Sequence, residues 1–137
     1  ILHPSDFSAT AERALDYALC LSEQFNAELH LMHVTSPTSS AVTAELDAPL
    51  GDDSPQARQL KQRLASSLPD GSGAHLVARS GDAASQITAY ADEAGIDMIV
   101  MGTKALTGLR RLVLGSVAEA VLRDAGCPVL VVGPQRD

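Results

Sequence analysis

Cysteine, positive charge and long hydrophobic runs are all scarce in this chain of 137 residues. Its two cysteines, Cys20 and Cys127, are far apart, without CxxC spacing or a nearby histidine pair. That pattern argues against a cysteine-based metal or redox site and favours a reducing, cytoplasmic environment. No apolar run approaches the roughly 20 residues of a membrane-spanning helix, so we expect no membrane association. The formal net charge of −7 argues against non-specific binding to nucleic acid or to anionic membranes.

Several common catalytic and nucleotide-binding motifs are absent as well. The sequence has no HExxH, no paired carboxylates in a glycine-framed segment and no Ser-His-Asp order with an oxyanion signal. We therefore expect a protein that is not an enzyme. No Gly-Lys-Ser/Thr occurs, which excludes a Walker A loop. Gly102 and Gly108 are too far apart for the GxGxxG of a Rossmann fold.

The histidines are scattered, and no carboxylate cluster accompanies them in the sequence. We therefore expect partly buried strand residues and predict no metal site on them. Of the cysteines, Cys20 is expected in the core and Cys127 at the start of a strand. The four histidines are His3, His30, His33 and His75.

Apolar residues in this chain alternate between short continuous runs and helical spacing. The sequence predicts five strands, near residues 1–3, 28–34, 74–78, 98–101 and 129–132, and four helices, near residues 8–25, 54–68, 82–95 and 114–122. Strands and helices that alternate in this way form right-handed crossovers and a parallel sheet covered on both faces. We therefore predict a single doubly wound α/β domain, with a loop over residues 35–53. The sequence leaves open whether the chain is a fragment or one half of a tandem protein.

The polar loops after the first and fourth strands mark the predicted ligand site. Doubly wound sheets bind ligands beyond the carboxyl ends of their strands, where the strand order reverses. Gly102 follows the fourth strand, and Gly115 and Ser116 come directly before the last helix. Free main-chain N–H groups at a helix start favour an anion. Lys104, with the arginines of the same loop, adds positive charge, although a solvated basic loop explains such a short cluster equally well.

Five segments of the chain carry a family resemblance. They are residues 1–8 (ILHPSDFS), 31–34 (LMHV), 101–104 (MGTK), 115–119 (GSVAE) and 127–132 (CPVLVV). Together they resemble the universal stress protein family over nearly the full length. The resemblance implies a strand order of 3-2-1-4-5 and a homodimer formed through the last strand. An apolar edge strand, such as the one predicted at residues 129–132, fits a symmetric dimer on physical grounds too.

The family has ATP-binding and non-binding members, and the binders carry Gly-x-x-Gly, nine residues and then Gly-Ser/Thr. Gly102 matches the first glycine, and Gly115 and Ser116 match the final pair. Ala105 stands where the binders have the second glycine. If that position needs a positive φ, alanine costs about 1–2 kcal/mol. Each 1.4 kcal/mol corresponds to about tenfold in affinity, so the substitution weakens ATP binding without necessarily abolishing it.

Most of the remaining residues of the nucleotide site also follow from the resemblance. Those implied are Pro4, Ser5 and Asp6 for the adenosine and Val34 for the adenine. Independently of the resemblance, the N–H groups of Ser116 and Val117 at the helix start can bind a phosphate, and Lys104 adds positive charge. Asp6 has two interpretations: a contact to the nucleoside or, through water, to a divalent ion, and a turn residue that caps the first helix. We thus predict an ATP-binding regulatory or stress-response module that binds ATP alone or with Mg²⁺ and has at most slow hydrolysis. The alternative is a non-nucleotide-binding dimeric interaction protein with a vestigial phosphate loop.

Overall fold

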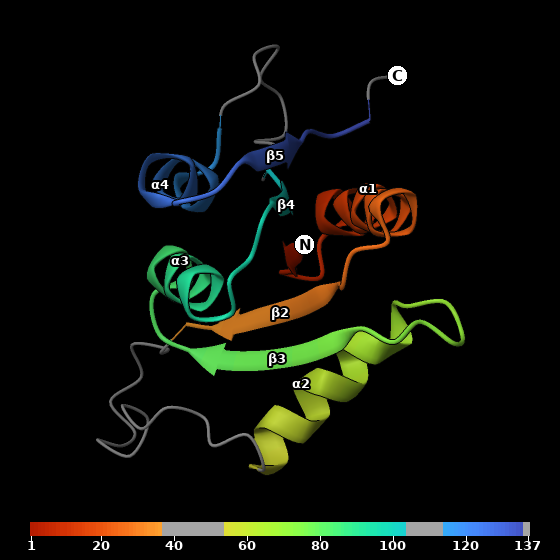
Figure 1. Ribbon diagram of the computed structural model, residues 1–137. Helices are drawn as coiled ribbons and strands as arrows, with labels where there is room; N and C mark the ends of the chain where they lie inside the picture. Colours follow the sequence, from red (N-terminus) through yellow and green to blue (C-terminus); the bar gives the residue numbers. More distant parts are fainter. Residues whose placement is uncertain (37–53, 104–113, 136–137) are drawn as a thin grey trace.

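The computed structural model describes residues 1–36, 54–103 and 114–135 (Figure 1). Strands and helices alternate through these residues as the sequence predicts. The elements are β1 (Leu2–Pro4), α1 (Ala9–Phe25), β2 (His30–Thr35), α2 (Pro55–Ser66), β3 (His75–Ser80), α3 (Ala83–Glu93), β4 (Ile99–Gly102), α4 (Ser116–Asp124) and β5 (Val129–Val132).

The five strands form one sheet in the order β3-β2-β1-β4-β5, and every pair is parallel. The predicted fold class and strand order are confirmed. β1 lies at the centre: Leu2 is in register with His30 of β2 on one side and with Ile99 of β4 on the other. The chain leaves β1 through α1 toward β2 and leaves β4 through α4 toward β5, on the other face of the sheet. The strand order therefore reverses between β1 and β4.

The sheet is covered on both faces, α1 and α2 on one and α3 and α4 on the other (Figure 1). Neighbouring residues of one strand feed the two cores because side chains alternate across a sheet. Leu31 packs in the core that includes Leu64 of α2, whereas Met32 packs in the core that includes Ile87 of α3. This double coverage explains why the strands read as continuous apolar runs.

Three of the four described helices begin with a side-chain cap, and α4 does not. Ser8, Ser54 and Asp82 accept hydrogen bonds from the main-chain N–H groups three residues on, at 3.2, 3.1 and 3.0 Å. Gly115 occupies the same position before α4 and has no side chain to offer. Among these helices, α4 alone therefore has a first turn whose main-chain N–H groups receive no hydrogen bond from a capping side chain.

Two predictions differ from the structure. The third strand runs from His75 to Ser80 and not over residues 74–78, because its pairing with β2 continues to the register Thr35↔Ser80. Cys20 is exposed and not part of the core. It follows Ala18, which is buried, by two residues, and two helical positions turn a side chain by about 200°.

The loop predicted for residues 35–53 falls mostly outside the described residues. Among those that are described, no helix combines the length and the apolar character that crossing a bilayer requires.

Candidate functional site

A cavity of about 210 Å³ opens at the carboxyl end of the sheet, where the strand order reverses. Its walls come from the carboxyl ends of β1, β2 and β4, from the residues that follow β1 and β2, and from the amino-terminal parts of α1, α3 and α4. Eight of the ten residues predicted for the site line this one cavity: Pro4, Ser5, Asp6, Val34, Gly102, Gly115, Ser116 and Val117. The other two, Lys104 and Ala105, lie outside the described residues. The structure thus brings together segments that the sequence separates by more than a hundred residues.

Gly102 ends β4 at a place where no larger residue fits. A Cβ atom added there would lie 2.7 Å from the carbonyl carbon and oxygen of Thr10 and 3.0 Å from the main-chain nitrogen of Ala11. Those atoms are backbone of the first turn of α1, which no side-chain rotation can move. Glycine is therefore required by the close approach of α1 to β4, and not by an unusual φ.

The first turn of α4 forms part of the wall of the cavity. Gly115 has φ −62° and ψ 153°, so the chain enters the helix from an extended conformation. Its carbonyl oxygen accepts the N–H of Glu119 at 2.9 Å, the first helical bond. The N–H groups of Ser116, Val117 and Ala118 precede that bond and have no helical acceptor. They leave a partial positive charge at the cavity, and the Ser116 hydroxyl adds another donor.

The loop after β1 is held by hydrogen bonds within itself and to β2. The N–H of Ser5 donates to the carbonyl oxygen of Met32 at 2.8 Å, and the N–H of Phe7 donates to Ser5 Oγ at 3.1 Å. Asp6 Oδ1 accepts the N–H of Ser8 at 3.0 Å, and Phe7 has a left-handed φ of 62°. Asp6 is therefore a turn residue, but the cap of α1 is Ser8 and not Asp6. The Asp6 side chain is exposed beside the cavity.

An apolar wall completes the cavity, and sequence analysis missed most of it. The sequence predicts Val34 as a lining residue, whereas Ala83 and Ile87 of α3 and Met101 of β4, which also line the cavity, are not among the predicted site residues. Ile87 and Met101 are buried, 3% and 5% exposed. Their apolar spacing is the same whether they face only the core or also a ligand. No signal in the sequence separates the two cases.

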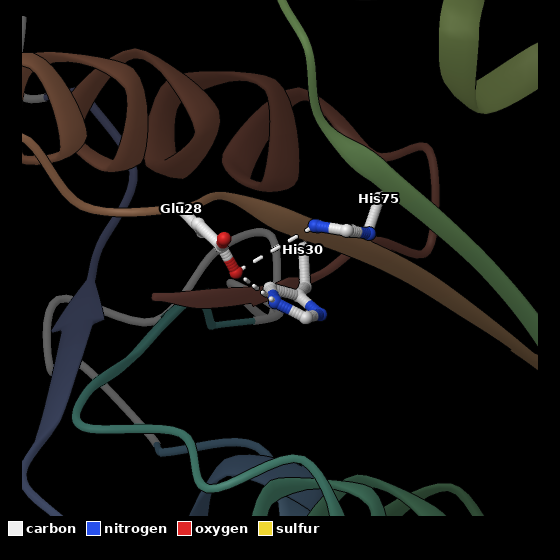
Figure 2. Close-up of side chains that lie close together, drawn as sticks. All are labelled: Glu28, His30 and His75. Carbon is white, nitrogen blue, oxygen red and sulfur yellow. Dashed lines mark ion pairs between the residues drawn. The ribbon is translucent and has the colours of Figure 1, made fainter.

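A second group of polar side chains lies at the amino end of the same sheet. Figure 2 shows the Glu28 carboxylate beside both His30 and His75, with its Oε2 atom 3.8 Å from Nε2 of His30 and 3.6 Å from Nε2 of His75. The sequence predicts no carboxylate cluster beside the histidines, and the structure places one carboxylate, that of Glu28, beside these two. Strand pairing brings together His30 and His75, which are 45 residues apart in sequence and directly opposite in the sheet.

Burial lowers the pKa of two histidines. Desolvation lowers the pKa of His30, and the charge of nearby His75 lowers it further. Desolvation also lowers the pKa of His3, which is 1% exposed at the centre of the sheet. His3 Nδ1 lies 2.8 Å from the carbonyl oxygen of Val100, whereas no described group lies within hydrogen-bonding distance of Nε2. A proton on Nε2 would therefore have no acceptor in this core.

The fold is that of a doubly wound α/β domain, and its cavity lies at the switch point of the sheet, where domains of this class bind ligands. The chain belongs to the universal stress protein family, whose profile matches residues 1–133. It is 33% identical to universal stress protein MJ0531 of Methanocaldococcus jannaschii over 96% of this chain and 80% of that protein. It is 31% identical to universal stress protein YxiE of Bacillus subtilis over 93% and 92% of the two chains.

A solved relative connects the fold with a nucleotide. The crystal structure of a universal stress protein in complex with cAMP matches this chain with a TM-score of 0.65 and 26% identity. The match covers 96% of this chain and 94% of that one. Nucleotide binding is thus described for a relative of the same fold.

Proposed function

We propose that this protein is a stress-response module that binds ATP, alone or with Mg²⁺, in the cavity at the carboxyl end of the sheet. The observation that supports this most is the uncapped first turn of α4, which faces the same cavity as the β1 loop and an apolar wall. A nucleotide needs one site for an anion, one for a sugar and one for a flat base. The cavity offers all three.

Each part of the nucleotide has a matching part of the cavity. The phosphates take the N–H groups at the start of α4 and the Ser116 hydroxyl, since a helix N-terminus favours anions. The adenine lies against Val34 and Ile87, and the ribose lies near Asp6. Because no described group is placed as a general base beside the phosphate position, the module binds ATP with at most slow turnover.

Calorimetric titration with ATP and Mg²⁺ tests this function, and two variants of Ser116 dissect it. Ser116→Ala removes the hydroxyl, and we expect a loss of about 0.5–1.5 kcal/mol, or about two- to twelvefold in affinity. Ser116→Pro also removes the N–H, and we expect a further loss. Proline suits the first helical position, and Gly115 already has the extended conformation required before it.

Ala9→Pro is the matched control, because Ala9 is the first residue of α1 and does not line this cavity. It should leave ATP affinity unchanged. No heat at millimolar ATP would contradict the proposal and favour the alternative, a dimeric interaction protein with a vestigial loop. Ala105→Gly separates a weak site from a vestigial one, because it should tighten binding only if the loop contacts the phosphates.

We also infer a homodimer formed through β5, which is an edge of the sheet. The carbonyl oxygens of Pro128 and Val132 accept hydrogen bonds from Ile99 of β4 and from Thr103 directly after it. Because main-chain groups alternate along a strand, those of Val131 face away from β4. Leu130 is 38% exposed on this strand. An unpaired apolar edge favours association with a second copy.

Leu130→Lys should convert the dimer to a monomer, because a charged side chain on an edge strand opposes pairing. Light scattering after size exclusion gives the mass of each. A monomeric wild-type chain at micromolar concentration would contradict the inference.

A further inference from the structure

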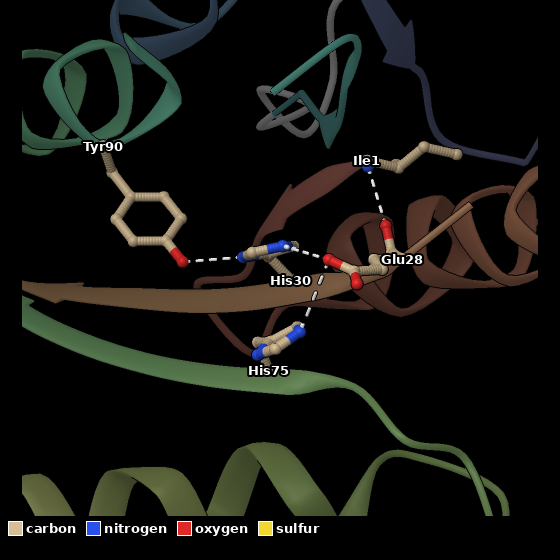
Figure 3. A network of polar contacts seen from close by, with 5 residues as sticks. All are labelled: Ile1, Glu28, His30, His75 and Tyr90. Carbon is tan, nitrogen blue, oxygen red and sulfur yellow. Dashed lines mark hydrogen bonds and ion pairs between the residues drawn. The ribbon is translucent and has the colours of Figure 1, made fainter. Parts of the chain in front are cut away.

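The cluster of Glu28, His30 and His75 lies far from the ATP cavity, at the opposite end of the strands. His30 and His75 are directly paired in β2 and β3, so their side chains leave the sheet on the same face. Glu28 precedes His30 by two residues, just before β2 begins, and its carboxylate lies beside both rings. The main-chain nitrogen of Ile1 donates to the carbonyl oxygen of Glu28 at 2.8 Å, which anchors the backbone that carries the carboxylate (Figure 3).

The three side chains present their ligand atoms to one small volume. One nitrogen of each imidazole and one carboxylate oxygen lie within 4.8 Å of one another. In a tetrahedral site with bonds of about 2.0–2.1 Å, ligand atoms are about 3.4 Å apart. The separations of 3.6 and 3.8 Å to Glu28 are close to that value.

Rotation of the exposed side chains can supply the remaining adjustment. The Glu28 and His75 side chains are 80% and 55% exposed, whereas His30 is 13% exposed. The rings of His30 and His75 are now stacked, with centroids 4.4 Å apart and planes at 25°. A common ion requires the His75 ring to turn until its nitrogen points at the same place, and solvent leaves room for that turn.

The ring nitrogen of His30 that faces away from Glu28 also has a hydrogen-bond partner, as is usual for metal-binding histidines. This nitrogen, Nδ1, lies 2.6 Å from the hydroxyl oxygen of Tyr90 on α3 (Figure 3). With the proton on Nδ1 donated to Tyr90, the lone pair of Nε2 faces Glu28. The guanidinium of Arg79 lies 5.0 Å from the centre of the Tyr90 ring and pairs with Glu93, which keeps the tyrosine in place.

We propose that Glu28, His30 and His75 bind one divalent transition-metal ion of the class of Zn²⁺, Ni²⁺ and Cu²⁺. Two imidazoles and one carboxylate suit these ions, whereas Mg²⁺ and Ca²⁺ prefer oxygen ligands alone. Three protein ligands leave a fourth position for water, since the site is open on the side of His75. The ion joins β2 to the edge strand β3 and so stabilises the sheet at this end.

Calorimetric titration of the full chain with Zn²⁺ in a weakly coordinating buffer tests the site. We expect one ion per chain. His75→Gln and Glu28→Gln should each weaken binding by more than tenfold. Glu23→Gln is the matched control, because Glu23 is also an exposed glutamate but lies on α1 outside the cluster, and it should leave the affinity unchanged. No Zn²⁺ binding at micromolar concentration, or equal binding by His75→Gln, would overturn the proposal.

Cu²⁺ gives a second, spectroscopic measurement. Electron paramagnetic resonance of the Cu²⁺ form should show two nitrogen ligands in the wild type and one in His75→Gln. A stoichiometry of one ion to two chains would overturn a site contained in one chain. The variants can be checked for folding by circular dichroism, and unaltered ATP titration would show that the two ends of the sheet remain separate.

Tyr90→Phe tests the positioning of His30 while it keeps the ring that packs beside Arg79. We expect Zn²⁺ affinity to fall by about tenfold, as for other changes behind a metal ligand, with both nitrogens still visible in the Cu²⁺ spectrum. Unchanged affinity would overturn the role of Tyr90. Loss of one nitrogen signal would overturn its assignment as a positioning residue.

Discussion

The two ends of this parallel sheet carry groups of opposite chemical preference. At the carboxyl end, the uncapped turn of α4 presents N–H groups and the Ser116 hydroxyl to a cavity. At the amino end, Glu28, His30 and His75 each place one possible metal-ligand atom in the same small volume. The first arrangement favours an anion and the second a cation.

The difference follows from the direction of the chain. In a parallel sheet every crossover helix starts at the carboxyl end of the strands and finishes at the amino end. Helix N-termini carry partial positive charge and C-termini partial negative charge. Helix α3 contacts both ends: Ala83 and Ile87 line the cavity, and Tyr90 bonds His30. One helix therefore supports both groups, and variants can test whether they act independently.

Gly102→Ala should have the largest effect on stability at the carboxyl end, because the added Cβ forces α1 and β4 apart beside the cavity. We expect the free energy of unfolding to fall by about 1–3 kcal/mol, as for other overpacked sites. Urea unfolding followed by circular dichroism measures it. The matched control is Gly73→Ala, which has open space around its Cβ position and should change stability by no more than about 0.5 kcal/mol. Equal effects of the two changes would contradict the close-approach argument.

Acidification should give the next largest effect, at the centre of the sheet and at its amino end. The folded state holds His3 and His30 with pKa values below the ordinary 6.5. Between those lowered values and 6.5, the unfolded chain binds more protons than the folded chain. The free energy of unfolding therefore falls as pH falls below 6.5, by at most about 1.4 kcal/mol per pH unit for each group.

Urea unfolding at several pH values between 7.5 and 5 measures this loss. Stability that stays constant or rises as the pH falls from 6.5 would contradict the account. Nuclear magnetic resonance of the His3 ring gives an independent check, since the midpoint of its titration should lie below pH 6.5.

The smallest expected effects are those of a substitution at one end of the sheet on ligand affinity at the other end. Ser116→Pro should leave Zn²⁺ affinity unchanged, and His75→Gln should leave ATP affinity unchanged, because the residues lie at opposite ends. The same two calorimetric titrations measure both. A change of tenfold in either direction would show that α3 couples the two ends.

Much of the fold was predictable because its signals are local. Apolar runs bounded by turns predicted the strands, and Ser8, Ser54 and Asp82 predicted three helix starts that the structure confirms. The errors came where local signals are weak. The bounds of β3 depended on its pairing with β2, and Cys20 depended on which side of α1 faces the sheet.

The candidate cavity was predictable in part. Glycines and polar residues after strands predicted the loops that line it, because turns and helix starts have a recognisable composition. Ile87 and Met101 were not recognised as lining residues, since an apolar side chain has the same pattern in a core and in a binding wall. The reason that Gly102 is glycine was not predictable either, because it lies in the backbone of α1.

The sequence by itself determined the α/β alternation, the family and the segments that meet at the carboxyl end, because periodicity and turn chemistry act over a few residues. Tertiary structure alone decided which residues far apart in the chain become neighbours. Strand register brought His75 to His30, and helix packing brought Tyr90 behind it. Register and packing depend on the whole sheet. No local pattern of histidines and glutamates contains that information.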